Sequence, residues 1–209
     1  MHIRALAASV FVFALPAFAM AQTWTSPDGF LSLTPPNADT FQAVTSPPPP
    51  FIGLWVSNDE SMRFGVVKIA VPRNIKLIQS SAEEGFAEAI GGNVARLPTR
   101  EVSGHEVWTM KASGPLGETT QALVRHDGAL YKVMAATVGG APDAALVDQF
   151  INSLSVAQPS TPLDTQPVRD LGGGVDPHDL STRIGGAAAL LGIGLLIYFA
   201  LRGKRSRQS

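Results

Sequence analysis

An uninterrupted run of 18 residues without a charge, at positions 184–201, constrains this chain more than any other feature. As a helix the run would be about 27 Å long, close to the hydrocarbon core of a bilayer at about 30 Å. It has no polar face, which a helix packed on a globular domain would need. Four basic residues and no acidic residue follow it, from Arg202 to Arg207, and positive flanks stay cytoplasmic. The run therefore predicts a transmembrane helix at 184–201 and a basic cytoplasmic tail at 202–209.

The N-terminus carries the pattern of a cleavable signal peptide. A basic start precedes an apolar stretch, and Ala19-Met20-Ala21 puts small residues at the two positions that a signal peptidase reads. This pattern predicts a signal peptide at 1–21, with Ala17-Phe18-Ala19 as an alternative cleavage site. An uncleaved anchor is disfavoured because the apolar stretch is short and contains Pro16.

Together the two ends predict a single-pass protein of the bacterial inner membrane. Residues 22–157 would form a periplasmic, or more generally extracytoplasmic, domain, and the C-terminus would lie in the cytoplasm. The intervening residues 158–183 are rich in Pro, Gly, Asp, Ser and Thr and nearly free of large apolar side chains. Such a segment cannot bury enough surface to offset the entropy of ordering it, so it predicts a flexible tether.

The charge and the cysteine count exclude several classes of function. Five of the 16 basic residues, but none of the 17 acidic residues, lie in the two ends, so the part of the chain at 22–183 is acidic. An acidic exported segment argues against nucleic-acid binding, which needs clustered cations. The chain has no cysteine, which excludes a disulfide scaffold, a thiolate zinc site, a lipid-modified cysteine and a cysteine nucleophile.

The first half of the domain is predicted to form three strands and a helix. Strand patterns cover 30–33, 51–56 and 62–71, and the alternation of the third shifts parity at Val66-Val67, which predicts a bulge near Gly65. A helix follows. Ser80 with Glu83, or Ser81 with Glu84, has the spacing of a capping box at its start, and Gly91-Gly92 ends it.

The second half is predicted to form two hairpins and a C-terminal helix. Strand patterns at 94–101 and 106–111 flank Ser103-Gly104, and those at 119–126 and 130–138 flank Asp127-Gly128. The last of these strands is apolar on both faces, which predicts an interior strand. The closing helix has Pro142 in its first turn and an apolar stripe at helical spacing: Leu146, Val147, Phe150, Ile151 and Leu154. The order predicts an α+β domain, an antiparallel sheet covered by two helices.

Three local motifs in this chain resemble those of a known protein family. The chain has a turn leading into a strand (DGFLSLTPP), a glycine hairpin followed by an aromatic (SGHEVW), and a strand with Tyr131 near its start before a helix that ends in Phe150-Ile151-Asn152-Ser153-Leu154. With these motifs it resembles the Mog1/PsbP-like α/β/α sandwich, including exported bacterial members of the DcrB group. The resemblance covers about residues 23–156. It implies a binding or assembly factor and supplies no catalytic residues.

The sequence offers no catalytic, metal or cofactor site. His105 and His126 each lie at a predicted hairpin turn, where solvated polar side chains are expected, and no histidine or serine motif of known chemistry is present. Trp55 and Trp108 lie in predicted strands, where an aromatic side chain ordinarily belongs to the core. If one face of the sheet is partly open, these two tryptophans would line a ligand groove.

Three hypotheses about function follow. The first is a non-catalytic, membrane-anchored binding or accessory module of an envelope complex, with a protein partner. The second is a surface protein processed at a C-terminal sorting signal, because a glycine-rich stretch, a membrane helix and a basic end also form that signal. The third is an enzyme whose site has no recognisable motif.

Overall fold

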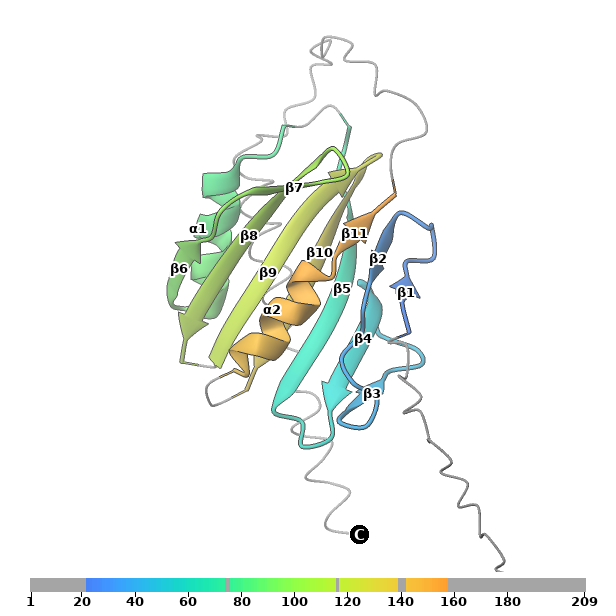
Figure 1. Ribbon diagram of the computed structural model, residues 1–209. Coiled ribbons are helices and arrows are strands. Elements are labelled where there is room, and N and C mark those ends of the chain that lie inside the picture. The colour runs from blue at the N-terminus through green and yellow to red at the C-terminus, as the bar shows by residue number, and fades with distance from the viewer. Residues whose placement is uncertain (1–21, 74–75, 116, 139–141, 158–209) are drawn as a thin grey trace, which may run out of the picture.

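The computed structural model describes residues 22–73, 76–115, 117–138 and 142–157 (Figure 1). The elements follow one another in this order: β1 (Trp24–Thr25), β2 (Leu31–Leu33), β3 (Phe41–Ala43), β4 (Phe51–Ser57), β5 (Met62–Ala70), α1 (Gln79–Ile90), β6 (Asn93–Arg96), β7 (Arg100–Val102), β8 (His105–Gly114), β9 (Gly117–His126), β10 (Ala129–Thr137), α2 (Ala144–Asn152) and β11 (Ser155–Val156).

An antiparallel eight-stranded sheet forms the centre of the domain. Its strand order is β3-β4-β5-β10-β9-β8-β6, and β7 pairs with the other end of β8. Strand β10 lies between β5 and β9, and all nine of its residues are buried. This confirms the prediction of an interior strand, because a strand covered on both faces needs apolar side chains on both.

Both predicted hairpin turns are confirmed. Ser103 and Gly104 have φ angles of 51° and 81°, and Asp127 and Gly128 have φ angles of 44° and 75°, so each pair adopts the left-handed backbone of a tight hairpin turn. The prediction of a single strand at 94–101 is wrong. It divides into β6 and β7, because Pro98 lies between them and a proline has no N–H to donate to the ladder.

The two helices lie on opposite faces of the sheet. Alternate residues of β10 point to opposite sides: Tyr131 and Val133 join the core cluster that contains α2, whereas Leu130 joins the cluster that contains Phe86 of α1. In Figure 1, α2 crosses the front of the sheet, and α1 lies near β6 and β8. The predicted α+β class and its α/β/α layering are confirmed.

The predicted single sheet is wrong, because β2 belongs to a second, three-stranded sheet in the order β1-β2-β11. Leu31 and Leu33 of β2 and Val156 of β11 pack into the same core cluster as α2. The small sheet and α2 thus share one face of the large sheet. Strands β1 and β11 have two residues each, too few for a periodic signal in the sequence.

The predicted bulge near Gly65 is also wrong. The pairing of β5 with β10 is continuous, and the irregularity lies in the facing strand β4, between Phe51 and Gly53. Val66 and Val67 are both buried because β5 is covered on both faces, which produced the apparent change of parity.

The helix ends agree only in part with the sequence. The predicted capping boxes of α1 are wrong: the helix begins after Ile78 with no side-chain cap, and Ser81 is buried. Its predicted end is confirmed, because Gly91 is the left-handed C-cap with φ of 65°. In α2 the cap is Asp143, which accepts from the Leu146 N–H, so Pro142 precedes the cap instead of lying in the first turn.

Within the described ranges, none of the helices has the length and hydropathy that a membrane crossing requires. The predicted signal peptide at 1–21, tether at 158–183, transmembrane helix at 184–201 and tail at 202–209 all lie outside the described residues.

Candidate functional site

Asp28 is the centre of a polar cluster that joins the small sheet to the large one. The turn Ser26-Pro27-Asp28-Gly29 between β1 and β2 closes with a hydrogen bond from the Gly29 N–H to the Ser26 carbonyl, at 2.8 Å. This turn presents the Asp28 carboxylate to β5 and β10. Lys68 Nζ of β5 lies 2.6 Å from Asp28 Oδ2, and the Tyr131 hydroxyl of β10 donates to the same oxygen.

The other carboxylate oxygen is satisfied by the turn itself. Ser26 Oγ donates to Asp28 Oδ1 at 2.6 Å, and the Phe30 N–H donates to it at 3.3 Å. Lys68 Nζ also lies 5.5 Å from the centre of the Tyr131 ring, within the range of a cation–π contact. Every group of the cluster therefore has a partner inside the domain.

The protonation of this cluster is fixed at neutral pH. Partial burial raises the pKa of Asp28, but the hydrogen bonds from Lys68, Ser26, Tyr131 and the Phe30 N–H outweigh it and hold the pKa well below its usual range. The hydrogen bond to Asp28 raises the pKa of Lys68, and burial raises the pKa of Tyr131. The pKa of each group is thus shifted away from neutral pH, which suits a structural clasp and does not suit a general acid or base.

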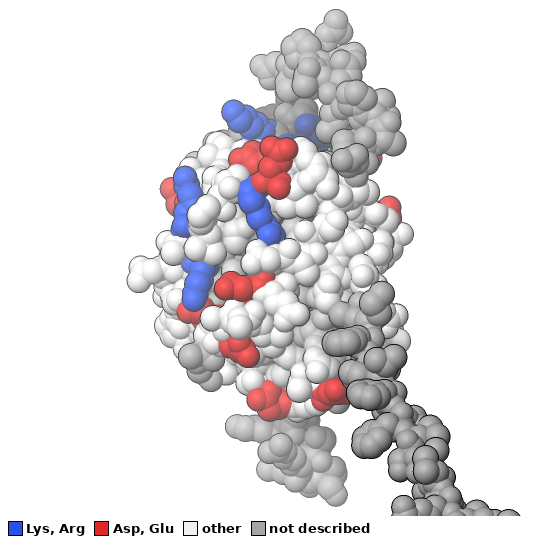
Figure 2. All heavy atoms as spheres, viewed as in Figure 1, with Lys and Arg blue, Asp and Glu red and all other residues white. Residues whose placement is uncertain are grey.

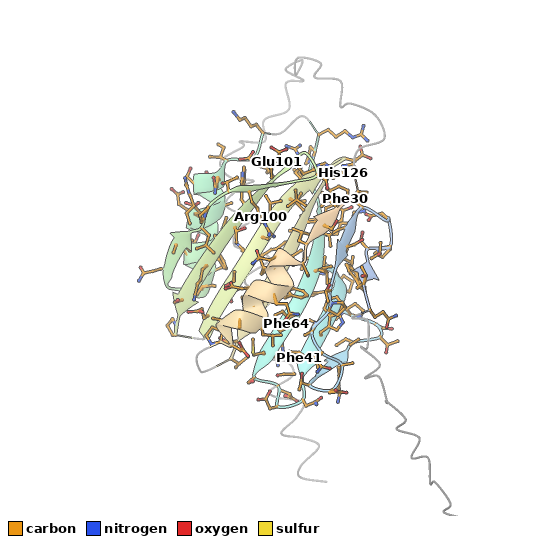
Figure 3. The ribbon with its side chains drawn as sticks, viewed as in Figure 1. Phe30, Phe41, Phe64, Arg100, Glu101 and His126 are labelled. Carbon is orange, nitrogen blue, oxygen red and sulfur yellow. The ribbon has the colours of Figure 1, made fainter. Side chains whose placement is uncertain are left out.

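An aromatic cluster adjoins the clasp at Phe30. The Phe30 ring stacks on His126 with centroids 4.0 Å apart (Figure 3). It also meets the His105 ring edge to face, with centroids 5.2 Å apart. The two imidazoles are 5.6 Å apart. The prediction of a solvated turn histidine is wrong for His105, which is only 8% exposed and packs in this cluster, whereas His126 is partly exposed. Sequence spacing could not reveal the cluster, since its members come from three separate segments.

The three motifs that carry the resemblance meet here. Asp28 and Phe30 belong to the first, His105 to the second and Tyr131 to the third. The end of the third motif is tied to the same face by Arg100 of β7, whose guanidinium donates to the Ile151 carbonyl and to Asn152 Oδ1 at the C-terminal turn of α2. In this chain residues of the three motifs thus make contacts between the layers of the fold.

Trp55 and Trp108 lie on opposite faces of the sheet, so the structure does not bring them together. Trp55 is 6% exposed and packs on the α2 side, where it meets Trp24 edge to face at 5.6 Å. A Cβ atom at Gly53 would lie 2.9 Å from the Trp24 ring, so this contact depends on a glycine there. Trp108 packs beside α1. Ligand binding by either tryptophan stays a prediction.

Lys132 is a buried polar residue that no sequence motif indicated. This lysine is 0% exposed in the middle of β10, its Nζ has no hydrogen-bond partner among the described residues, and burial lowers its pKa to about 7. The available signal was a lysine inside a strand that was otherwise apolar on both faces. No three His, Cys, Asp or Glu side chains in the described part of the chain lie close enough to hold a metal ion together.

Charged side chains of both signs lie next to one another on the α2 side of the molecule. Figure 2 shows basic and acidic groups interleaved over the upper part of this face and further acidic groups toward its lower end. The remainder of the visible described surface carries few charges.

Replacing Asp28 with asparagine keeps the shape of the clasp and removes its charge. We expect the free energy of unfolding to fall by about 1–2 kcal/mol, because charge-assisted hydrogen bonds are lost at a partly exposed site. The pKa of Asp28 is lower in the folded chain, so its stabilisation is fully present above about pH 4 and is lost as the pH falls through the acid range. Denaturant unfolding between pH 2 and pH 7 measures both effects, and the variant should lose part of the acid dependence.

The matched control is Asp127→Asn. Asp127 pairs with Arg73, but both side chains are more than half exposed, so we expect a change below about 0.5 kcal/mol. Equal losses from the two variants would contradict a structural role for the Asp28 clasp.

Comparisons with known proteins concern the fold. No protein-family model matches the chain, and no curated protein matches it. The solution structure of cyanobacterial PsbP (CyanoP) from Synechocystis is similar, with a TM-score of 0.50 and 12% identity, over 69% of this chain and 98% of that one. A protein of Bacteroides thetaiotaomicron also matches, with a TM-score of 0.41 and 10% identity, over 66% of this chain and 49% of that one. The first likeness confirms a PsbP-like fold.

Proposed function

We propose that this chain is a non-catalytic binding or accessory module of a bacterial envelope complex. The observation that carries the proposal is the Asp28 clasp, where Asp28 of the first resemblance motif and Tyr131 of the third are hydrogen-bonded to each other and their pKa values are shifted away from neutral pH. Residues fixed in this way stabilise a surface and do not perform proton transfer. The PsbP-like fold and the resemblance to binding and assembly factors support the same function.

The proposal includes a place in the cell, which rests on the sequence. The segment at 184–201 holds the domain at the inner membrane, the tether at 158–183 gives it reach, and the basic tail stays in the cytoplasm. The domain then meets its protein partner outside the cytoplasm. A tethered module gains from a high effective concentration near partners in the same membrane.

A pull-down tests this proposal. A tag is inserted in the tether of the full chain, membranes are solubilised after mild cross-linking, and partners are identified by mass spectrometry. The control keeps the tether, helix and tail but lacks residues 22–157. We expect a partner that is enriched with the full chain and absent from the control, and equal recovery in both would contradict a role for the domain.

The intact mass of the recovered chain distinguishes the anchored module from the second hypothesis, a surface protein processed at a C-terminal sorting signal. The glycines at 172–174 and 185–186 mark where a sorting enzyme would cut. A mass that includes the basic tail supports the anchored module. A mass ending near Gly174 or Gly186 would mean that the helix is a discarded sorting signal and that the protein is displayed elsewhere.

A further inference from the structure

The first strand of the domain begins close to the chain end that export would create. Cleavage after Ala21 makes Gln22 the first residue of the mature chain. Gln22 and Thr23 are exposed and precede β1, whose pairing with β2 starts at Trp24. Within the described residues, Gln22 takes part in no strand pairing, so neither its backbone nor its side chain is held by the sheet.

Trp24 is the first of these residues whose side chain packs on the core. Its ring meets Trp55 edge to face at 5.6 Å and lies against Gly53, where a Cβ atom would be 2.9 Å away. Trp55 in turn belongs to the core cluster on the α2 side and is 6% exposed. Only two residues separate Trp24 from the mature end, so the loss of three residues would remove this ring from the core.

A free α-amine at this position would leave the contact open to attack. Proteolysis concentrates at exposed chain ends that no strand pairing ties down. An aminopeptidase recognises the free amine and removes one residue at a time, so Gln22 and Thr23 would be lost first and Trp24 would follow. An end without an amine gives such an enzyme no starting point.

A glutamine at the first position of a chain can remove the amine by its own chemistry. The neutral α-amine nitrogen attacks the side-chain amide carbon, Cδ. The bond from N to Cδ forms, the bond from Cδ to Nε2 breaks, and Nε2 leaves as ammonia with one proton from the amine. The product is the five-membered lactam pyroglutamate, and the step needs no oxidant, reductant or second substrate. Because both groups belong to one residue, they react at a high effective concentration once the residue is free to fold back on itself.

We propose that Gln22 is a modification site, cyclised to pyroglutamate in the mature protein, and that the blocked end keeps Trp24 on the core. The α-amino group ordinarily titrates near pH 8, so a fraction of it is neutral and nucleophilic at physiological pH. Exposure and the lack of strand pairing leave Gln22 free to close the ring. The inference rests on the proposed export of the domain, because only cleavage after Ala21 creates this amine.

The N-terminal peptide of the mature chain tests the modification. The full chain is recovered from membranes, its free amines are dimethylated so that no ring can close afterwards, and it is then digested with trypsin. The N-terminal tryptic peptide is 22–63, because no Lys or Arg lies between Gln22 and Arg63. We expect this peptide to carry no label at its N-terminus and to be lighter by about 17 Da, the mass of ammonia. A labelled peptide that begins at Gln22, or one that begins at Met20 or Ala5, would overturn the proposal.

The matched control is Gln22→Ala, which keeps the alanines at 19 and 21 that the signal peptidase reads but removes the side-chain amide. Its N-terminal peptide should carry the label. Incubation with a broad-specificity aminopeptidase should shorten the variant and leave the parent at full length, and thermal unfolding beforehand confirms that both are folded. Equal trimming of the two chains, or no trimming of the variant, would overturn the protective role of the lactam. None of these results depends on the pull-down, so the two proposals fail separately.

Discussion

A chain with methionine in place of Lys132 should be more stable at neutral pH than the parent, by about 2–4 kcal/mol. The parent must bury either a charged ammonium or an amine that has given up its proton, and burial lowers the pKa of Lys132 from 10.5 to about 7. Methionine has a similar length, carries no charge and packs well against the ring of Phe86, whose centre lies 5.3 Å from the Lys132 Nζ. Denaturant unfolding of parent and variant at pH 7 measures the difference.

The same substitution should change the pH dependence of stability. Between about pH 7 and pH 10 the unfolded parent binds one proton more than the folded parent, so its free energy of unfolding rises with pH across this window. The other cations on the α1 side of the large sheet include Arg63 and Arg125, which stay charged throughout. The variant should therefore show a flatter profile, and the two chains should converge in stability as the pH approaches 10.

The control for this prediction is Lys76→Met. Lys76 is exposed, so its removal should change neither the stability by more than about 0.5 kcal/mol nor the slope between pH 7 and pH 10. If Lys132→Met destabilises the chain at pH 7, Lys132 has an anionic partner in solution, and the argument for an unpaired buried cation is wrong.

Phe150→Ala should have the largest destabilising effect, with a loss of about 3–5 kcal/mol. Phe150 is 1% exposed on α2, and its ring meets Phe64 at 4.6 Å and Trp55 at 6.0 Å. Truncation removes the aromatic contacts through which the helix packs on the sheet and leaves a cavity between the layers. Denaturant unfolding gives the change in free energy, and near-ultraviolet circular dichroism reports the altered surroundings of the tryptophan.

Two further variants show whether the ring itself matters. Phe150→Leu fills most of the volume and should lose less than half as much stability as the alanine variant. Leu146→Ala removes a partly buried side chain of the same helix and should cost less than Phe150→Ala. Equal losses at positions 146 and 150 would show that α2 is held by general apolar burial and not by the aromatic contacts.

The parts of the fold that could be predicted are those with local causes. Asp127-Gly128 and Ser103-Gly104 set their hairpins through backbone angles that few other residues adopt, and Gly91 ended its helix for the same reason. The central strand followed from apolar residues on both faces. The bulge was misplaced because two-sided burial and a shift of parity give the same apolar pattern at Val66-Val67.

The parts that could not be predicted depend on contacts between distant segments. Asp28 and Tyr131 are 103 residues apart in sequence, and only the docking of the small sheet brings them together. The same docking gathers Phe30 and the two histidines. Trp55 and Trp108 looked equivalent in the sequence, but strand pairing places them in different layers. Lys132 could have been noticed, since a lysine inside an interior strand contradicts the pattern around it.

The pairing of β11 with β2 has a mechanical consequence for a domain that is pulled at its C-terminal end. Any load on residue 157 first reaches Ser155–Val156, which pairs with only two residues of β2, and the hydrogen bond from the Ala157 N–H to the Phe30 carbonyl at 2.8 Å. These few hydrogen bonds would break before the longer strand pairings of β5, β9 and β10 are loaded. Phe30 is also the residue that stacks on His126. Tension on the C-terminal side would therefore displace Phe30 within the aromatic cluster while the central sheet stays intact.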